Sequence, residues 1–401
     1  MTEAHSVTRL LIPSHVMSFL CSQCGECCTS KWRISVDRPS YDELVKKLAE
    51  RGRQEELDRS ISEDKKGLQI RFSKNGTCPY LTNHHQCSLQ LELGAEYLLD
   101  ICKVFPRIIY ASRNTLEFSL AMTCKTAIQT LLHGPIRIIE VPYPVDTSRY
   151  GFSFIEPLNY KRYDPDQALW NHPQLTYRAL ESKLIEVMQS RPYSMRQRLI
   201  RVGQIVARAA DENAAQTGDI LQDMDRIPWP QPKAEQDFSE QLRFFYQLSK
   251  AYLKKFPAKP HSQLLRTVLL TLSGDQRKVP AEPPDPDEYQ KLVDRYLRPA
   301  LAITESMIEN YLVNAILGKQ FYSKSLPLAY YRLTFMVAAA TALSVAYGAM
   351  TTQPVSQQTM VQAIYDSESI FYSQWFYPYL AFWEWGNDHQ QIIHHGLALV
   401  R

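Results

Sequence analysis

Apolar and polar positions alternate along several short stretches in the first 135 residues. Alternation with a period of two is typical of a strand with one buried face. Apolar positions three and four residues apart, which are typical of an amphipathic helix, occur between these stretches. We predict strands at Arg9–Ile12, Trp32–Asp37 and Leu68–Phe72, a strand or the start of a helix at Leu116–Met122, and helices at Ser40–Glu50, Leu89–Val104 and Lys125–Leu132. The N-terminal third is therefore expected to be α+β.

Two local signals refine this picture. Ser40 is followed three residues later by Glu43, which matches a capping box, so the first helix should begin with Ser40 as its N-cap. Asn75-Gly76 predicts a turn directly before Cys78.

The helical period dominates the rest of the chain, after an irregular crossover at 135–170. Proline-rich segments at Asp211–Asp237 and Asp275–Asp287 predict loops. The helices expected between and after them are Leu175–Gln189, Ser194–Ala210, Phe238–Phe256, Ser262–Leu272, Glu288–Arg298, Ala302–Gly318, Leu328–Gly348 and Val355–Trp375, with one more near the C-terminus. The predicted fold is mainly α with a small α+β cysteine-rich metal-binding module at the N-terminus.

These patterns suggest three regions. Residues 1–134 would form the cysteine-rich metal or iron–sulfur module, and 135–287 a helical middle region with Pro-rich linkers. Residues 288–401 would form a C-terminal helical region.

Charge and hydropathy exclude some classes of protein. A net charge of +3 over 401 residues gives no basic patch for nucleic acid. The most apolar run, Phe335–Met350, is shorter than the roughly 18–20 residues that span a bilayer, so we expect a buried core helix and no membrane partner. The first 19 residues lack the pattern of a signal peptide, and we expect a cytoplasmic protein.

The chain has eight cysteines, all in its first third, and four of them follow C-x2-C-x2-C-C spacing. Clustered thiols in a reducing compartment bind metal more often than they form disulfides. We therefore predict that all eight are metal ligands: Cys21, Cys24, Cys27, Cys28, Cys78, Cys87, Cys102 and Cys124.

Spacing alone does not separate zinc from an iron–sulfur cluster. The side chains of the neighbours Cys27 and Cys28 diverge, so these two thiols would serve different centres, or one would be structural. His84 or His85, between Cys78 and Cys87, could replace a thiolate; an exposed turn is the alternative.

The flanks of these cysteines, together with a segment near the C-terminus, resemble the flagellin lysine-N-methylases. The resembling segments are Phe19–Cys28, Cys78–Leu81, Cys87–Gly94, Glu117–Cys124 and Ile308–Asn314. The resemblance implies transfer of methyl groups from S-adenosylmethionine to lysine amines of flagellin, by an enzyme that carries a [4Fe-4S] cluster. The compact cysteine spacing also occurs in small zinc or iron–sulfur proteins. The alternative is therefore a non-enzymatic metal-binding protein that acts through protein interaction.

No glycine-rich turn follows a predicted strand, so a Rossmann-type cofactor site is not expected. Arg107 could hold the cofactor's carboxylate by a bidentate pair, or form a structural salt bridge. Glu309 and Asn310, polar residues on an apolar helix, could face a cofactor pocket or join helices.

Aromatic side chains could line a channel for the substrate lysine, because aromatic faces attract an ammonium group. The candidates are Tyr311, Tyr330 and Tyr331, with core packing as the alternative. The sequence identifies no catalytic base.

Overall fold

The computed structural model describes most of the chain. The described residues are 7–29, 33–112, 114–143, 161–162, 177–210, 225–226, 228–231, 239–274, 278–318, 321, 325–371 and 389–398. The predicted loops at 211–237 and 275–287 lie largely or partly outside them.

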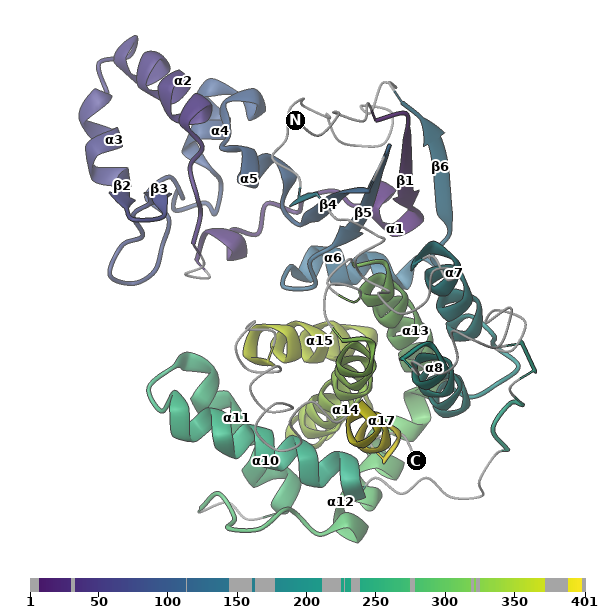
Figure 1. Cartoon of the computed structure of the whole chain (residues 1–401). Helices are drawn as coiled ribbons and strands as arrows, with labels where there is room; N and C mark the ends of the chain where they lie inside the picture. The colour runs from purple at the N-terminus through teal and green to yellow at the C-terminus, as the bar shows by residue number, and fades with distance from the viewer. Residues whose placement is uncertain are drawn as a thin grey trace.

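A five-stranded sheet lies above the helical body in the view of Figure 1, with strand order β6-β1-β5-β4-β7. β5 is buried along its whole length and pairs antiparallel with β4 and parallel with β1. The strands are β1 (Arg9–Pro13), β4 (Arg107–Ser112), β5 (Thr115–Leu120), β6 (Ile138–Pro142) and β7 (Lys161–Arg162). The strand predicted at 9–12 is confirmed, as is the strand alternative at 116–122.

A small lobe lies to one side of this sheet (Figure 1) and has its own hydrophobic core, which includes Leu44, Ile70 and Leu99. Its elements are α2 (Arg38–Ala49), α3 (Gln54–Ser60), β2 (Ile61–Asp64), β3 (Gly67–Ile70), α4 (Ser88–Leu93), η2 (Ala95–Tyr97) and α5 (Asp100–Val104). In place of the strand predicted at 32–37, the described residues 33–37 contain an isolated bridge from Ser35 to Gln69.

Two predictions in this lobe are wrong. α2 begins at Arg38 rather than after Ser40, because the side chain of Asp37 accepts a hydrogen bond from the Ser40 N–H at 2.8 Å. Pro39 fits the first turn, where its missing N–H costs nothing. The helix predicted over 89–104 is broken into α4, η2 and α5, because Gly94 has φ = +110° and ends α4.

The cap on α2 predicts a stability effect. Asp37→Ala should lower the free energy of unfolding of the lobe by about 1 kcal/mol, because the helix loses its N-cap acceptor. Urea denaturation followed by amide exchange in α2 measures this. Asp37→Asn, which keeps an acceptor oxygen, is the matched control; an equal loss in both variants would contradict the assignment.

Helices make up the remainder of the molecule. The largest, α14, packs against α8, α10, α11, α15 and α17. Short elements α1 (Ser14–Met17), η1 (Glu26–Cys28), α6 (Lys125–Gln129) and η3 (Thr130–Leu132) flank the sheet. The body comprises α7 (Tyr177–Met188), α8 (Met195–Ala210), α10 (Ser239–Lys255), α11 (Pro260–Ser273), α12 (Pro286–Leu292), η6 (Val293–Leu297), η7 (Arg298–Ala300), α13 (Leu301–Leu317), α14 (Leu326–Thr351), α15 (Gln357–Phe371) and α17 (His389–Ala398).

α14 contains the apolar run singled out in the sequence. It is long and apolar enough to cross a membrane, but 83% of its most apolar stretch is buried inside the protein. The prediction of a buried core helix is confirmed.

One continuous hydrophobic core joins the sheet to the helical body, while the lobe of residues 34–102 has a separate core. The mainly helical class with an N-terminal sheet region is therefore confirmed. The boundaries predicted near 134 and 287 remain predictions.

Candidate functional site

All eight cysteines line one pocket. Four come from the segment before the lobe, three from the lobe itself, and one follows the end of β5. Its walls also include Phe19, His85, Pro106 and Thr123. The convergence predicted from the sequence is thus seen as a shared pocket, although Cys28 and Cys124 lie far apart along the chain.

Local backbone structure aims these thiols at the pocket. Gly25 has φ = +72°, which turns the chain between Cys24 and η1, and a Cβ there would come within 3.2 Å of His85. The carbonyl of Cys28 accepts a hydrogen bond from the N–H of Cys78 at 2.7 Å, so the two cysteine segments are joined directly.

Backbone N–H groups face several of the sulfur atoms. Cys87 and Cys124 are the N-cap residues of α4 and α6, and N–H groups of the first turn lie near each sulfur, where they partly offset the effect of burial on its pKa. The N–H of Gln23 lies 3.4 Å from Cys21 Sγ. Hydrogen bonds to sulfur stabilise thiolates and tune the potential of iron–sulfur centres.

Electrostatic neighbours divide the thiols into two subsets. Cys124 interacts with Cys21 and Cys24. The other subset contains Cys27, Cys28, Cys78, Cys87 and Cys102, with Cys27 Sγ and Cys28 Sγ 3.9 Å apart.

Burial raises the pKa of Cys87, raises that of Cys124 to about 11, and raises that of Cys102 further, where neighbouring thiolates add to the effect. So many thiols cannot ionise together without positive charge among them. A bound metal supplies that charge, because coordination deprotonates thiols. The donor set therefore fits a thiolate-bound metal group.

Within the described parts of the chain, no three His, Cys, Asp or Glu side chains are gathered closely enough to hold a single metal ion. The thiols surround a space instead of meeting at a point. His85 lines that space and its neighbour His84 does not, and both side chains are exposed.

Arg107, predicted to hold a cofactor's carboxylate, begins β4 beside the pocket. Its guanidinium lies 5.0 Å from the centroid of the Phe19 ring and donates to the Phe19 carbonyl at 3.1 Å. Burial lowers the pKa of Arg107 to about 10, and nearby Cys21 partly offsets this. Its cofactor role stays a prediction.

Glu309 and Asn310 on α13 make buried contacts with protein groups. Glu309 accepts hydrogen bonds from Arg191 at 3.1 Å and Arg198 at 2.7 Å. The amide of Asn310 donates to the carbonyls of Leu131 and Gly134 and accepts from the N–H at 136. Both residues fix α13 to its surroundings, and neither lines the two pockets described here. Their predicted cofactor role stays a prediction.

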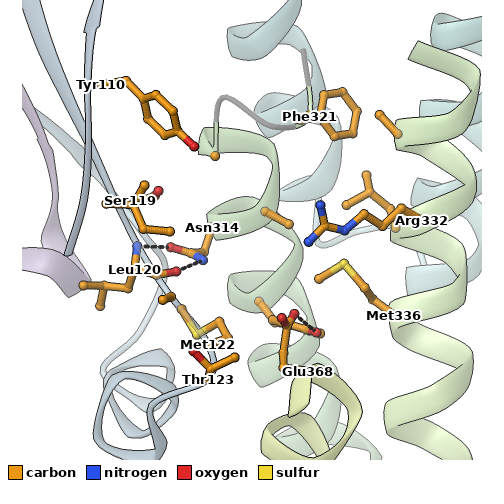
Figure 2. Close-up of a pocket in the computed structure, with 17 residues that line it drawn as sticks. Tyr110, Ser119, Leu120, Met122, Thr123, Asn314, Phe321, Arg332, Met336 and Glu368 are labelled. Atoms are coloured by element: carbon orange, nitrogen blue, oxygen red, sulfur yellow. Dashed lines mark hydrogen bonds between the residues drawn. The ribbon is translucent and has the colours of Figure 1, made fainter. Parts of the chain in front are cut away.

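Asn314, one turn further along α13, holds the end of β5. Its amide pairs with both the N–H and the carbonyl of Leu120, each at 2.9 Å (Figure 2). The chain then continues through Met122 and Thr123 to Cys124. α13 therefore positions the strand end that carries one of the thiols.

A second pocket lies between β4, β5 and helices α13, α14 and α15, and Thr123 lines both pockets. Figure 2 shows Arg332 of α14 and Glu368 of α15 projecting into it from different walls. Glu368 is buried, and its carboxylate accepts a hydrogen bond from the Tyr311 hydroxyl at 2.5 Å.

Of the three tyrosines considered for a lysine channel, Tyr311 lines this second pocket. Tyr330 packs against Gly203 and Gly396, and Tyr331 against Phe244, so core packing accounts for both. Sequence reasoning missed Arg332 and Glu368. The available signal was an acidic residue within the otherwise apolar face of the helix at 357–371.

The C-terminal domain family of the FliB lysine N-methylases matches residues 182–374. The chain is 30% identical over 135 residues to the flagellar biosynthetic protein FliU of Salmonella muenchen, an alignment that covers 31% of this chain and 76% of FliU. It is equally identical over 135 residues to lysine-N-methylases of Salmonella typhimurium and Salmonella choleraesuis, where the alignment covers 32% of each relative. No solved structure matches the chain.

The family match covers the helical body, including Glu309, Tyr311, Asn314 and Glu368. The FliU match covers more than two thirds of that relative. Together the named matches support a lysine N-methyltransferase. The chain belongs to the FliB lysine N-methylase family.

Proposed function

We propose that this protein transfers methyl groups from S-adenosylmethionine to lysine side chains of flagellin, and that it carries a [4Fe-4S] cluster in the cytoplasm. The single observation that carries the proposal is the pocket lined by all eight thiols, set against a helical body that matches the lysine N-methylase C-terminal domain. The relative FliU is named as a flagellar biosynthetic protein, which favours a flagellar substrate.

Two features favour an iron–sulfur cluster over mononuclear zinc. A tetrahedral zinc site draws four ligand atoms to within about 2.3 Å of one point. The described thiols enclose a space without such a point. The Gln23 N–H donates to Cys21 Sγ, and N–H groups near Cys87 and Cys124 add to the polar surroundings of sulfur that tune iron–sulfur centres.

The two subsets of thiols differ in number and in position. The five thiols around Cys28 exceed the three ligands that a cluster with one open iron would need. The three around Cys124 include the thiol that follows the end of β5, which Asn314 of α13 holds. When bound, a cluster with an open iron position could ligate the amino and carboxylate groups of S-adenosylmethionine.

The chain's own residues would orient the reactants. Arg107, beside Cys21, is our candidate for the cofactor's carboxylate. Lys125 forms an ion pair with Glu26 at 2.7 Å and lies 4.7 Å from the centroid of the Tyr365 ring. This contact ties the cysteine loop to α15, and so to the second pocket.

The test is to purify the protein without oxygen and measure iron, sulfide and flagellin methylation. About four irons and four sulfides per chain are expected, together with methylated lysines in flagellin that depend on S-adenosylmethionine. Cys102→Ser and Cys124→Ser, one from each subset, should lose methylation. Gln90→Ala changes the pocket wall without removing a thiol and is the matched control.

One or two zincs per chain, without sulfide and without methylation, would refute this function. That result would favour the alternative, a non-enzymatic metal-binding protein that acts through protein interaction. Methylation that survives in both cysteine variants would refute the role of the thiols while leaving the enzyme.

A further inference from the structure

The second pocket, which nothing in the proposed function uses, is built mainly of apolar side chains. Its walls include Leu120, Met122, Phe321, Leu333 and Met336. It offers about 70 Å³ to a water-sized molecule, whereas one water needs only about 10–15 Å³. An unbranched alkyl chain would fit such a space.

Few charged groups face this space from the described residues. Glu368 of α15 presents a carboxylate that is 6% exposed, and Arg332 of α14 presents a guanidinium. The amide of Asn314 is occupied by the backbone of Leu120, so it serves the fold and not a ligand. The polar chemistry of the pocket therefore comes mainly from an acid–cation pair and nearby tyrosines.

Aromatic rings accompany the carboxylate. Tyr110, Tyr311 and Phe321 contribute to the lining, and Tyr311 donates its hydroxyl to Glu368. An apolar space with rings and a single carboxylate suits a ligand with an alkyl stem and a terminal ammonium. The ε-amine of lysine has that form.

The pocket also lies where a methyl donor at the thiols could reach it. Thr123 lines both pockets and directly precedes Cys124. On α15, Tyr365 contacts Lys125 of the cysteine side, and Glu368 follows one turn later.

We propose that this pocket receives the substrate lysine and that Glu368 accepts the proton from its ammonium group. The inference rests on the proposed methyl transfer. In the step, an N–H bond of the lysine breaks and an O–H bond forms on Glu368. The nitrogen keeps the electron pair, which then forms the new N–C bond while the bond between the methyl group and the sulfonium sulfur of S-adenosylmethionine breaks, and S-adenosylhomocysteine leaves with that bond's electrons.

Two physical effects drive this proton transfer. Burial raises the pKa of Glu368, partly opposed by Arg332 and the Tyr311 hydrogen bond, so the carboxylate is a stronger base than an exposed glutamate. A lysine that enters the apolar pocket beside Arg332 would have its own pKa lowered by desolvation and by the neighbouring cation. The two shifts bring the pKa of the lysine ammonium and the pKa of Glu368 closer together.

The test compares Glu368→Gln with the wild type, both purified without oxygen. Glutamine keeps the shape and can still accept the Tyr311 hydrogen bond, but it cannot take a proton. We expect kcat for flagellin methylation to fall by about 10²- to 10⁴-fold, with iron content and S-adenosylmethionine binding unchanged. Glu368→Asp, which keeps a carboxylate, should recover part of the rate. Glu288→Gln on the exposed face of α12 is the matched control.

A second measurement does not depend on methylation. n-Butylamine, an alkyl stem with an ammonium group, should bind the wild type in calorimetry and bind at least about tenfold more weakly to Glu368→Gln. Equal binding to both proteins, or no binding to the wild type, would overturn the proposal.

The results separate the two hypotheses. Full methylation by Glu368→Gln overturns the role of Glu368 and leaves the proposed function. Butylamine binding that depends on Glu368, in a protein that methylates nothing, supports the lysine pocket and refutes the function. Loss of S-adenosylmethionine binding in Glu368→Gln with iron retained would overturn the inference by assigning the pocket to the cofactor.

Discussion

Arg198→Met is expected to lower the free energy of unfolding by about 3–5 kcal/mol. Arg198 and Glu309 are 3% and 2% exposed, and they form an ion pair at 2.7 Å. Arg198 also donates to the carbonyl of Met188 at 2.7 Å. Without the Arg198 cation, the buried Glu309 carboxylate keeps its ion pair with the exposed Arg191 but loses its buried partner. Leaving a buried charge poorly paired costs much more free energy than the intact ion pair contributes. Urea denaturation measures the loss.

Arg191 provides the matched control, because it binds the same carboxylate from the surface. Its side chain is 54% exposed and lies 3.1 Å from Glu309. Arg191→Met should cost less than about 1 kcal/mol, as exposed ion pairs do. Equal losses in the two variants would contradict the role given to burial. The double variant Arg198→Met with Glu309→Gln should recover part of the loss, since no buried charge remains.

The second large effect concerns pH and His15. His15 is buried at the end of β1, and its Nε2 donates to Asn314 Oδ1 at 2.7 Å. That oxygen also accepts from the N–H of Leu120, which fixes the proton on Nε2. Among the residues that the structure describes, none forms a hydrogen bond with Nδ1. Burial therefore lowers the pKa of His15 to about 4 from its ordinary 6.5, although the Asn314 hydrogen bond opposes the change.

The sign of the change in unfolding free energy with pH follows from the number of protons that the folded and unfolded states bind. Below pH 6.5 the unfolded chain binds a proton that the folded protein excludes until the pH approaches 4. The stability that neutral, buried His15 contributes is thus complete above pH 6.5 and is lost as the pH falls from 6.5 to about 4. The total loss is about 3 kcal/mol, at about 1.4 kcal/mol per pH unit.

Unfolding free energies measured from about pH 7.5 down to about pH 4 test this. His15→Gln should flatten the profile in that range, whereas the same change at exposed His133 should leave it as in the wild type. An unchanged slope in His15→Gln would assign the acid sensitivity to other groups.

Much of the secondary structure could be predicted because it depends on local periodicity. α8, α10, α13 and α14 lie within a few residues of their predicted bounds, since each has a long apolar pattern. The errors arose where one residue outweighed the pattern. Asp37 capped α2 ahead of Ser40, and Gly94 divided a stretch with a continuous helical period.

Pairings between distant residues could not be predicted in this way. Arg9 of β1 lies opposite Thr115 of β5, and no local pattern records that register. The convergence of eight thiols was predictable from composition, but their division into two subsets depends on how the lobe meets the sheet. The helical pattern could mark Glu368 as an acidic residue on a buried face, but its contacts with Tyr311 and Arg332 could not be predicted, because those residues lie on other helices.

The bond between Asn314 and β5 has a consequence for the order of events during synthesis. Asn314 leaves the ribosome 194 residues after Leu120, which takes about 10–40 s at roughly 5–20 residues per second. The thiol-bearing third of the chain is complete throughout that interval, but the amide that fixes its last strand does not yet exist. The proposed cluster, if it were inserted during translation, would meet an unfinished wall around Cys124. Under that proposal, metal loading is expected to follow chain release.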